Sequence, residues 1–189
     1  SLASYGAKGF RQTSSNWGAV VGAGHLMCAL SFIDSEPEDS EFTQKCKFLA
    51  ENAVQTCEIP FGMLYPDGAI AEGQGYWTFY IESLGQATQS ILNMCGDDYG
   101  CLDSPGYKEA ANFPLYVQSQ NGYYCYSSSG HTTGVGYWCA CDETYLISKF
   151  YDNPEQMETL KAFNDSINRK IGSMGMLWYE PSDIEVDVS

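Results

Sequence analysis

The stretch NWGAVVGAGHLMCALSFID, residues 16–34, decides the fold class, because its apolar residues return with the period of an α-helix. The residues that return at steps of three or four are Val20, Ala23, Met27, Leu30 and Ile33. This spacing predicts a helix with one buried stripe. His25 lies within the same stretch, and we interpret it as a hydrogen-bonded interior residue.

Helical periodicity continues through the next two segments. Ser35-Glu-Pro-Glu38 has the pattern of a capping box with proline in the first turn, which predicts the start of a second helix. The predicted buried positions of this helix are Phe42, Cys46, Leu49, Ala53 and Cys57. Those of a third helix, which Gly96 can end, are Trp77, Tyr80, Leu84, Ala87 and Ile91.

The second half of the chain predicts three further helices. Ser104-Pro105 begins a fourth, and Pro114 must kink or end it because proline lacks a backbone donor. A fifth helix would carry on one face Trp138, Cys141, Tyr145 and Lys149. Asn153-Pro154 caps a sixth, whose stripe is Met157, Leu160, Asn164, Ile167 and Ile171. Six helices with short links in pairs predict an all-α fold of about three antiparallel hairpins.

Size and charge limit the classes of function. The chain has 189 residues, which fits a single helical domain over residues 1–189. Its net charge is −15, with only nine Lys plus Arg, so it is poorly suited to bind nucleic acid. The same charge disfavours a highly sulfated substrate. No run of residues is apolar enough to cross a membrane, and we expect no membrane partner.

The eight cysteines contain no CxxC pair, so the sequence predicts no zinc site, and we expect neither a metal nor a cofactor. Three cysteines look like small core residues: Cys28, Cys46 and Cys57. Cys95 and Cys101 flank a Gly-Asp-Asp-Tyr-Gly turn and could form a disulfide. The even number of cysteines permits export. We expect a secreted or periplasmic protein, with a cytoplasmic location as the alternative.

Two long connections, residues 59–75 and 120–136, are rich in glycine and aromatic residues. Loops of that length in a helical domain are usually functional. Each connects one predicted hairpin to the next, so both should emerge on the same rim. The second connection contains His131, which is better placed than His25 for proton transfer and is our candidate catalytic histidine.

The segments SNWGAVVGAGHLMCALSF at 15–32 and PDGAIAEGQGYW at 66–77 resemble the helical toroid of the heparinase II/III family of polysaccharide lyases. The likeness covers residues 14–82 well and the remainder weakly. MLWYEP at 176–181 is similar to the way these toroids lead into their next domain. The resemblance implies an incomplete α/α toroid, a fragment of a longer chain with a following β-sandwich domain. It further implies β-elimination from an acidic, uronic-acid-containing polysaccharide or oligosaccharide.

The same resemblance implies roles for individual residues. Asn16 would neutralise the uronate carboxylate, and Tyr76 would act as the acid/base tyrosine. Trp17 and Trp77 would form walls on which sugars stack. Glu72 would orient the loop or bind a hydroxyl. The chain departs from many active lyases at Trp17, because those enzymes have a histidine beside the asparagine.

Other interpretations of these residues stay open. Tyr80, one turn beyond the candidate tyrosine, could replace it or contact the substrate. Asn16 could be a helix N-cap, and Tyr76 and Trp77 could anchor the core. Asp67 is typical of a turn residue.

Two other functions remain as alternatives to the lyase. A glycoside hydrolase on a similar toroid would use Asp67 and Glu72 as its acid/base pair. A non-catalytic module would bind a glycan or pack against a partner domain.

Overall fold

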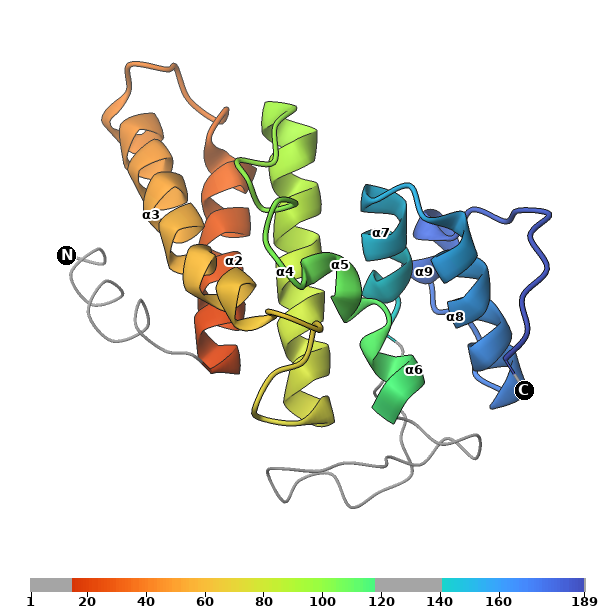
Figure 1. The fold of residues 1–189 in the computed structure, drawn as a ribbon. Coiled ribbons are helices and arrows are strands. Elements are labelled where there is room, and N and C mark those ends of the chain that lie inside the picture. Colours follow the sequence, from red (N-terminus) through yellow and green to blue (C-terminus); the bar gives the residue numbers. More distant parts are fainter. Residues whose placement is uncertain (1–14, 118–140, 189) are drawn as a thin grey trace. The chain divides into compact units, whose positions relative to one another are not determined.

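The structure, a computed structural model, describes residues 15–117 and 141–188. All regular secondary structure within these ranges is helical (Figure 1), which confirms the all-α prediction. The helices are α2 (Asn16–Phe32), α3 (Glu41–Met63), α4 (Gln74–Cys95), α5 (Tyr107–Ala110), α6 (Phe113–Val117), α7 (Glu143–Phe150), α8 (Pro154–Ser166) and α9 (Gly175–Trp178). None of these helices is long and apolar enough to span a lipid bilayer.

The described residues form two compact units. The first unit contains residues 15–63 and 83–104, and the second contains 64–82, 105–117 and 141–188. Helix α4 is continuous: its N-terminal part belongs to the second unit and its C-terminal part to the first.

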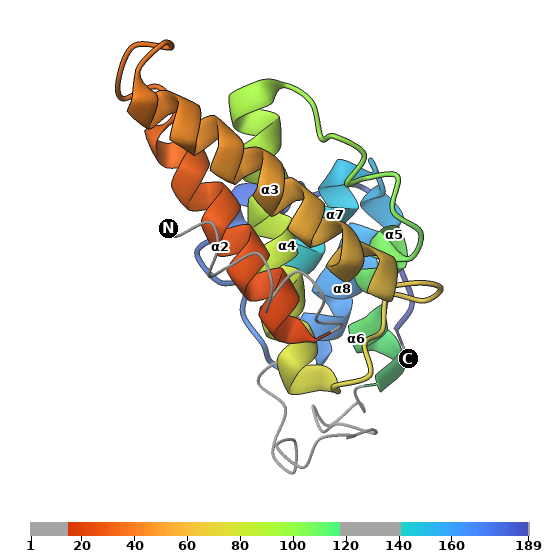
Figure 2. The same cartoon turned by 90° about the vertical axis from the view of Figure 1, so that its left-hand side faces the viewer.

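In the first unit, α2 and α3 run side by side as a helical hairpin (Figures 1 and 2). The buried face of α2 consists mainly of small residues, namely Gly18, Ala19, Gly22, Ala23 and Ala29 with Leu26 and Leu30. A Cβ added at Gly22 would lie 3.0 Å from the Sγ of Cys57. The small side chains therefore let the two helices approach closely.

The predicted stripe of α2 is only partly correct. Ala23 and Leu30 are buried, but Val20 is 40% exposed. Met27 is half-buried. The α2 sequence carries apolar residues on almost every side, so spacing alone did not single out the face that packs. His25 is exposed, so its interpretation as an interior residue is wrong.

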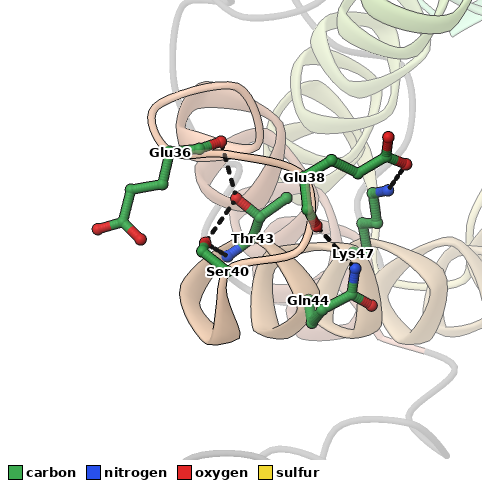
Figure 3. A network of polar contacts seen from close by, with 6 residues as sticks. All are labelled: Glu36, Glu38, Ser40, Thr43, Gln44 and Lys47. Atoms are coloured by element: carbon green, nitrogen blue, oxygen red, sulfur yellow. Dashed lines mark hydrogen bonds and ion pairs between the residues drawn. The ribbon is translucent and has the colours of Figure 1, made fainter.

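The start of α3 differs from the predicted capping box at Ser35. Ser40, directly before α3, accepts a hydrogen bond from the backbone N–H of Thr43 at 3.0 Å. The Thr43 hydroxyl in turn donates to the carbonyl of Glu36 at 3.2 Å (Figure 3). Ser35 instead donates to the carbonyl of Phe32. The N-cap therefore lies five residues beyond the predicted one.

The connection before α3 is further tied to the helix by two long side chains. Gln44 donates from Nε2 to the carbonyl of Glu38 at 2.8 Å, and Lys47 Nζ lies 2.7 Å from Glu38 Oε1 (Figure 3). On α3 itself, Cys46, Ala53 and Cys57 are buried as predicted. Phe42 is exposed and Leu49 is half-buried, contrary to the prediction.

Helix α4 confirms its predicted stripe in full. All five predicted positions are at most 2% exposed: Trp77, Tyr80, Leu84, Ala87 and Ile91. The helix ends before Gly96, which has φ +69° and donates its N–H to the carbonyl of Leu92 at 3.0 Å. Glycine tolerates this left-handed conformation, so the end of the helix follows directly from the sequence.

In the second unit, the predicted fourth helix is replaced by the two short helices α5 and α6. Gly106, at φ +88°, precedes α5, and a Cβ there would lie 2.1 Å from the carbonyl oxygen of Leu64. This close approach places the helix start at Gly106 and not at Ser104-Pro105. Pro114 lies in the first turn of α6, where its missing N–H removes no helical hydrogen bond.

Helices α7 and α8 pack against each other, and α9 packs against α7 (Figure 1). Asn153 caps α8 as predicted, because its side chain accepts a hydrogen bond from the N–H of Gln156. Helix α8 ends at Ser166, so Ile171 of the predicted stripe lies beyond the helix. Trp138 of the predicted fifth helix lies outside the described residues.

The segment after α9, predicted to lead out of the domain, packs on the second unit. The Tyr179 ring lies edge-on to Tyr145 with centroids 5.6 Å apart, and its hydroxyl donates to Glu158 at 2.9 Å. The backbone N–H of Ser182 also donates to Glu158. This segment therefore contributes to the packing of the unit.

The cysteines follow the prediction only in part. Cys46 and Cys57 are buried, but Cys28 is exposed. Cys95 is exposed at the end of α4 while Cys101 is buried, and both are free thiols. The predicted disulfide between Cys95 and Cys101 is therefore not formed in this structure.

Candidate functional site

The loop that carries the PDG motif is fixed by backbone contacts within the second unit. Asp67 accepts a hydrogen bond from the N–H of Ala69 at 3.2 Å, which confirms its role as a turn residue. Gly68 has φ +78°, and a Cβ there would lie 2.3 Å from the backbone nitrogen of Ala110. Only glycine fits this position, so the motif requires Gly68 for reasons of packing.

Trp77 holds the same loop from the first turns of α4. Its indole Nε1 donates to the carbonyl of Gly68 at 2.7 Å, and its ring centroid lies 5.1 Å from that of Phe113. Both Trp77 and Tyr80 are fully buried. Neither ring has a face open to a ligand in this structure. Trp77 could stack against a sugar, and Tyr80 could contact a substrate, only if the ring became accessible.

Glu72 and Tyr76 are both half-exposed. Glu72 lies in the loop, and Tyr76 lies in the first turn of α4. Between them, Gln74 is fully buried and donates from Nε2 to the carbonyl of Val117 at 3.1 Å. Tyr76 is therefore a partly accessible residue at the start of α4, directly after a fixed loop.

Asn16 and Trp17 lie at the start of α2 in the first unit. The N-cap of α2 is Ser15, so the interpretation of Asn16 as an N-cap is wrong. Asn16 is almost fully buried, whereas Trp17 is 59% exposed. Asn16 and Tyr76 belong to different units, so the roles that the resemblance implies for them in one active site stay a prediction. His131 lies outside the described residues.

The second unit also contains a cluster of ionisable groups that the sequence did not predict. The charges of Glu143, Arg169 and Asp142 act on Glu82, which lies on α4. Burial, and then the charge of Glu143, raise the pKa of Glu82 from 4.5 to about 7, while Arg169 opposes this shift. A carboxyl that keeps its proton near neutrality is a candidate general acid.

Cys141 belongs to the same cluster. Burial raises the pKa of its thiol well above 9, and the charges of Glu143 and Glu82 add to that shift. Asp142 accepts a hydrogen bond from the N–H of Gly172 at 3.1 Å. Nothing in the linear spacing relates Glu82 to Glu143, so only the tertiary structure could bring this cluster to light. The described residues contain no group of three or more His, Cys, Asp or Glu placed to hold a metal ion.

The first unit contains an apolar cavity of about 360 Å³ among α2, α3 and the end of α4. Its apolar lining includes Leu26, Leu30, Ala50, Val54 and Ile91. Lys47 also borders the cavity, but its ammonium group is paired with Glu38. Glu51, Gln55 and Tyr99 add polar groups to the lining.

The sequence matches no protein-family model, and no curated protein is significantly similar to it. The likeness to polysaccharide lyases therefore depends on the two motifs at 15–32 and 66–77 and on the all-α fold.

Proposed function

We propose that this chain is the helical domain of a polysaccharide lyase, which cleaves a uronic-acid-containing polysaccharide by β-elimination. One observation carries the proposal: the loop over residues 66–75 is fixed by Gly68 and Trp77, and Tyr76 follows it half-exposed at the start of α4. The helical hairpins α2–α3 and α7–α8 are compatible with an incomplete α/α toroid. A β-sandwich domain would complete the enzyme, in a secreted or periplasmic protein.

In the proposed reaction, a base removes the proton at C5 of the uronate and the glycosidic bond at C4 breaks. The C5 proton becomes acidic only when the neighbouring carboxylate is neutralised, and the Asn16 amide would supply that hydrogen bond. Tyr76 would protonate the departing oxygen, and His131 would take part in proton transfer. Trp17 offers an exposed flat ring to a sugar. Glu72 would bind a hydroxyl, while the buried Trp77 and Tyr80 would position the loop.

The test is the formation of an unsaturated product, which absorbs in the ultraviolet. The protein is incubated with alginate, hyaluronan, heparan sulfate and pectin, and Tyr76→Phe is compared with Tyr116→Phe, which changes an exposed tyrosine on α6. We expect Tyr76→Phe to reduce turnover at least 100-fold, since a lost acid/base group typically costs a factor of 10² to 10⁴. No increase in absorbance with any of the polymers would contradict the proposal.

A glycoside hydrolase is the second candidate, because burial, and then the charge of Glu143, raise the pKa of Glu82 to about 7. Glycoside hydrolysis commonly uses a pair of carboxyl groups, one of which is a protonated acid with a raised pKa. Saturated products that disappear in Glu82→Gln, and persist in Tyr76→Phe, would select the hydrolase over the lyase.

A further inference from the structure

The apolar cavity of about 360 Å³ in the first unit combines a buried apolar lining with exposed polar residues. Leu26, Leu30 and Ile91, which line it from α2 and α4, are at most 6% exposed. Glu51 on α3 and Tyr99, in the connection after α4, line the same cavity and are exposed to solvent. Because exposed residues contribute to the lining, the cavity reaches the surface, and its volume lies in the range of small-molecule binding sites.

The charged groups of the lining favour a positively charged ligand. Lys47 is the only cation among the lining residues, and its Nζ lies 2.7 Å from Glu38 Oε1 (Figure 3). Glu51, one turn further along α3, forms no ion pair within the described residues. The cavity therefore has one lysine that is already neutralised and one carboxylate that is not.

The rest of the first unit offers no free cation to an anionic ligand. The only Lys or Arg residues in the described part of this unit are Lys45 and Lys47, and each is paired with a glutamate. The whole chain has a net charge of −15, so its field attracts cations. An anionic ligand would have to break an existing ion pair, whereas a cation finds the Glu51 carboxylate available.

Tyr99 adds an aromatic ring to the same lining. Its φ of +51° is uncommon for a large residue, and its backbone N–H donates to Asp97 Oδ1 at 2.7 Å. This turn leaves the Tyr99 side chain 62% exposed where it lines the cavity. An ammonium group gains energy when it lies over the face of a tyrosine ring, so Tyr99 would complement Glu51 in binding a cation.

We propose that this cavity binds a small organic cation. Its apolar body contacts the buried lining, and its ammonium group is bound at the surface by Glu51 and Tyr99. The ligand class is an amine with one short alkyl or aryl group, because the cavity is near the lower end of the size range of such sites. The proposal is independent of the lyase assignment, which concerns the loop over residues 66–75.

Three probes with the same chain length test the proposal: hexylammonium, 1-hexanol and hexanoate. Each is titrated into the full chain at pH 7 and low salt, and its affinity is measured by calorimetry. We expect saturable 1:1 binding of hexylammonium, roughly 3- to 30-fold tighter than that of hexanol because of the ion pair and the aromatic contact. Hexanoate should bind most weakly. No saturable binding of hexylammonium, or equal affinity for either of the other probes, would overturn the proposal.

Nuclear magnetic resonance of methyl groups tests where the probe binds. Hexylammonium should shift the methyl signals of Leu26, Leu30 and Ile91. It should leave unchanged those of Leu146 and Leu160, which are fully buried in the second unit. Shifts confined to the second unit would contradict the proposal. Cavity signals that change with protein concentration alone would show that a second copy of the chain occupies the cavity, and would also overturn it.

Two matched variants test the role of the Glu51 carboxylate. Glu51→Gln should weaken hexylammonium binding about 2- to 5-fold and leave hexanol binding unchanged. Asp39→Asn makes the same charge change at an exposed residue of this unit outside the lining, and should leave both affinities unchanged. Wild-type affinity for hexylammonium in Glu51→Gln, or an equal loss in Asp39→Asn, would contradict the assignment of this carboxylate.

A third variant tests the apolar part of the site. Ala50 lines the cavity, so Ala50→Leu reduces the space that is left for the hexyl chain. It should weaken hexylammonium and hexanol alike by at least about 4-fold, which corresponds to one CH₂ group displaced from the cavity. Unchanged affinities in this variant would show that the probes bind elsewhere.

Discussion

In the first unit, α2 packs against α3 through a face made mainly of glycine and alanine, whereas in the second unit large rings fill the interior. Fully buried residues of the second unit include Trp77, Tyr80, Tyr107 and Tyr145. Small side chains gain their stabilisation from close approach of two helices, and aromatic side chains gain theirs from the area that each ring buries. We therefore expect the second unit to lose the more stability when a large buried side chain is truncated.

The second unit also contains a network of buried, hydrogen-bonded polar side chains. In the second unit, Gln156 donates to Asn112 at 2.9 Å and accepts from Ser148 at 2.9 Å. Asn164 donates to the Tyr145 hydroxyl at 2.7 Å. A buried group that loses its partner pays the full cost of desolvation. The second unit thus combines large rings with a polar network, and its ionisable cluster makes it the more pH-sensitive of the two.

The largest expected change in stability distinguishes Trp77 from Trp17, the two tryptophans to which the lyase resemblance assigns the same sugar-stacking role. Trp77→Ala removes a fully buried ring and the hydrogen bond to Gly68, and should lower the free energy of unfolding of the second unit by about 3 to 5 kcal/mol. Trp17→Ala removes an exposed ring and should change stability by less than about 0.5 kcal/mol. Urea unfolding followed by circular dichroism measures both. Similar decreases in the free energy of unfolding of the two variants would contradict this difference between the buried and the exposed tryptophan.

Two glycines give the next effect. Gly68→Ala places a Cβ against the Ala110 backbone at a positive φ, and should cost about 3 kcal/mol from overpacking and backbone strain. Gly22→Ala places a Cβ 3.0 Å from a thiol that can move slightly, and alanine favours the helix by about 1 kcal/mol. We expect Gly22→Ala to stay within about 1 kcal/mol of the wild type in urea unfolding.

The third effect is a pH dependence of the second unit. The pKa of Glu82 is raised from 4.5 to about 7 in the fold, so the folded state binds the proton more tightly than the unfolded state. This contribution is fully present below pH 4.5 and is lost as the pH rises through about 7.

Glu82 is partly exposed, and solvent screening reduces the contribution to about 1 kcal/mol. Glu82→Gln mimics the protonated acid and should flatten the stability profile between pH 4.5 and 7. The other groups that act on Glu82 are Glu143, Asp142 and Arg169, and all remain in this variant. Glu51→Gln changes an exposed acid of the first unit and should leave the slope intact. An unchanged slope in Glu82→Gln would contradict the assignment.

The sequence predicted α4 far better than α2, and the reason is physical. In α4 the apolar residues occupy one side of the helix, so the spacing from Trp77 to Ile91 identified the buried face. In α2 nearly every side is apolar, and the choice of the glycine-rich face depends on α3. Likewise, the N-cap at Asn153 follows from local chemistry, whereas Gly106 begins α5 because of the distant Leu64.

The same distinction applies to the candidate site. The turn at Asp67 and the requirement for glycine after it could be predicted from the motif, and the structure confirms the turn. The contact of Trp77 with Phe113 and the effect of the Glu143 charge on Glu82 could not, since both depend on segments far apart in the sequence. Local motifs therefore located the loop, and tertiary packing decided which of its side chains reach solvent.

The smallest expected effect should be equal in the two units. Lys45 and Glu41 form an exposed ion pair one turn apart on α3 at 2.6 Å, and Lys161 and Asp165 form the corresponding pair on α8. Such pairs contribute about 0.3 to 0.5 kcal/mol and are screened by salt. Lys45→Gln and Lys161→Gln should each lower stability by about that amount at low salt, and by less at high salt. A much larger loss for one of them would mean that the two units differ at their surfaces as well as in their interiors.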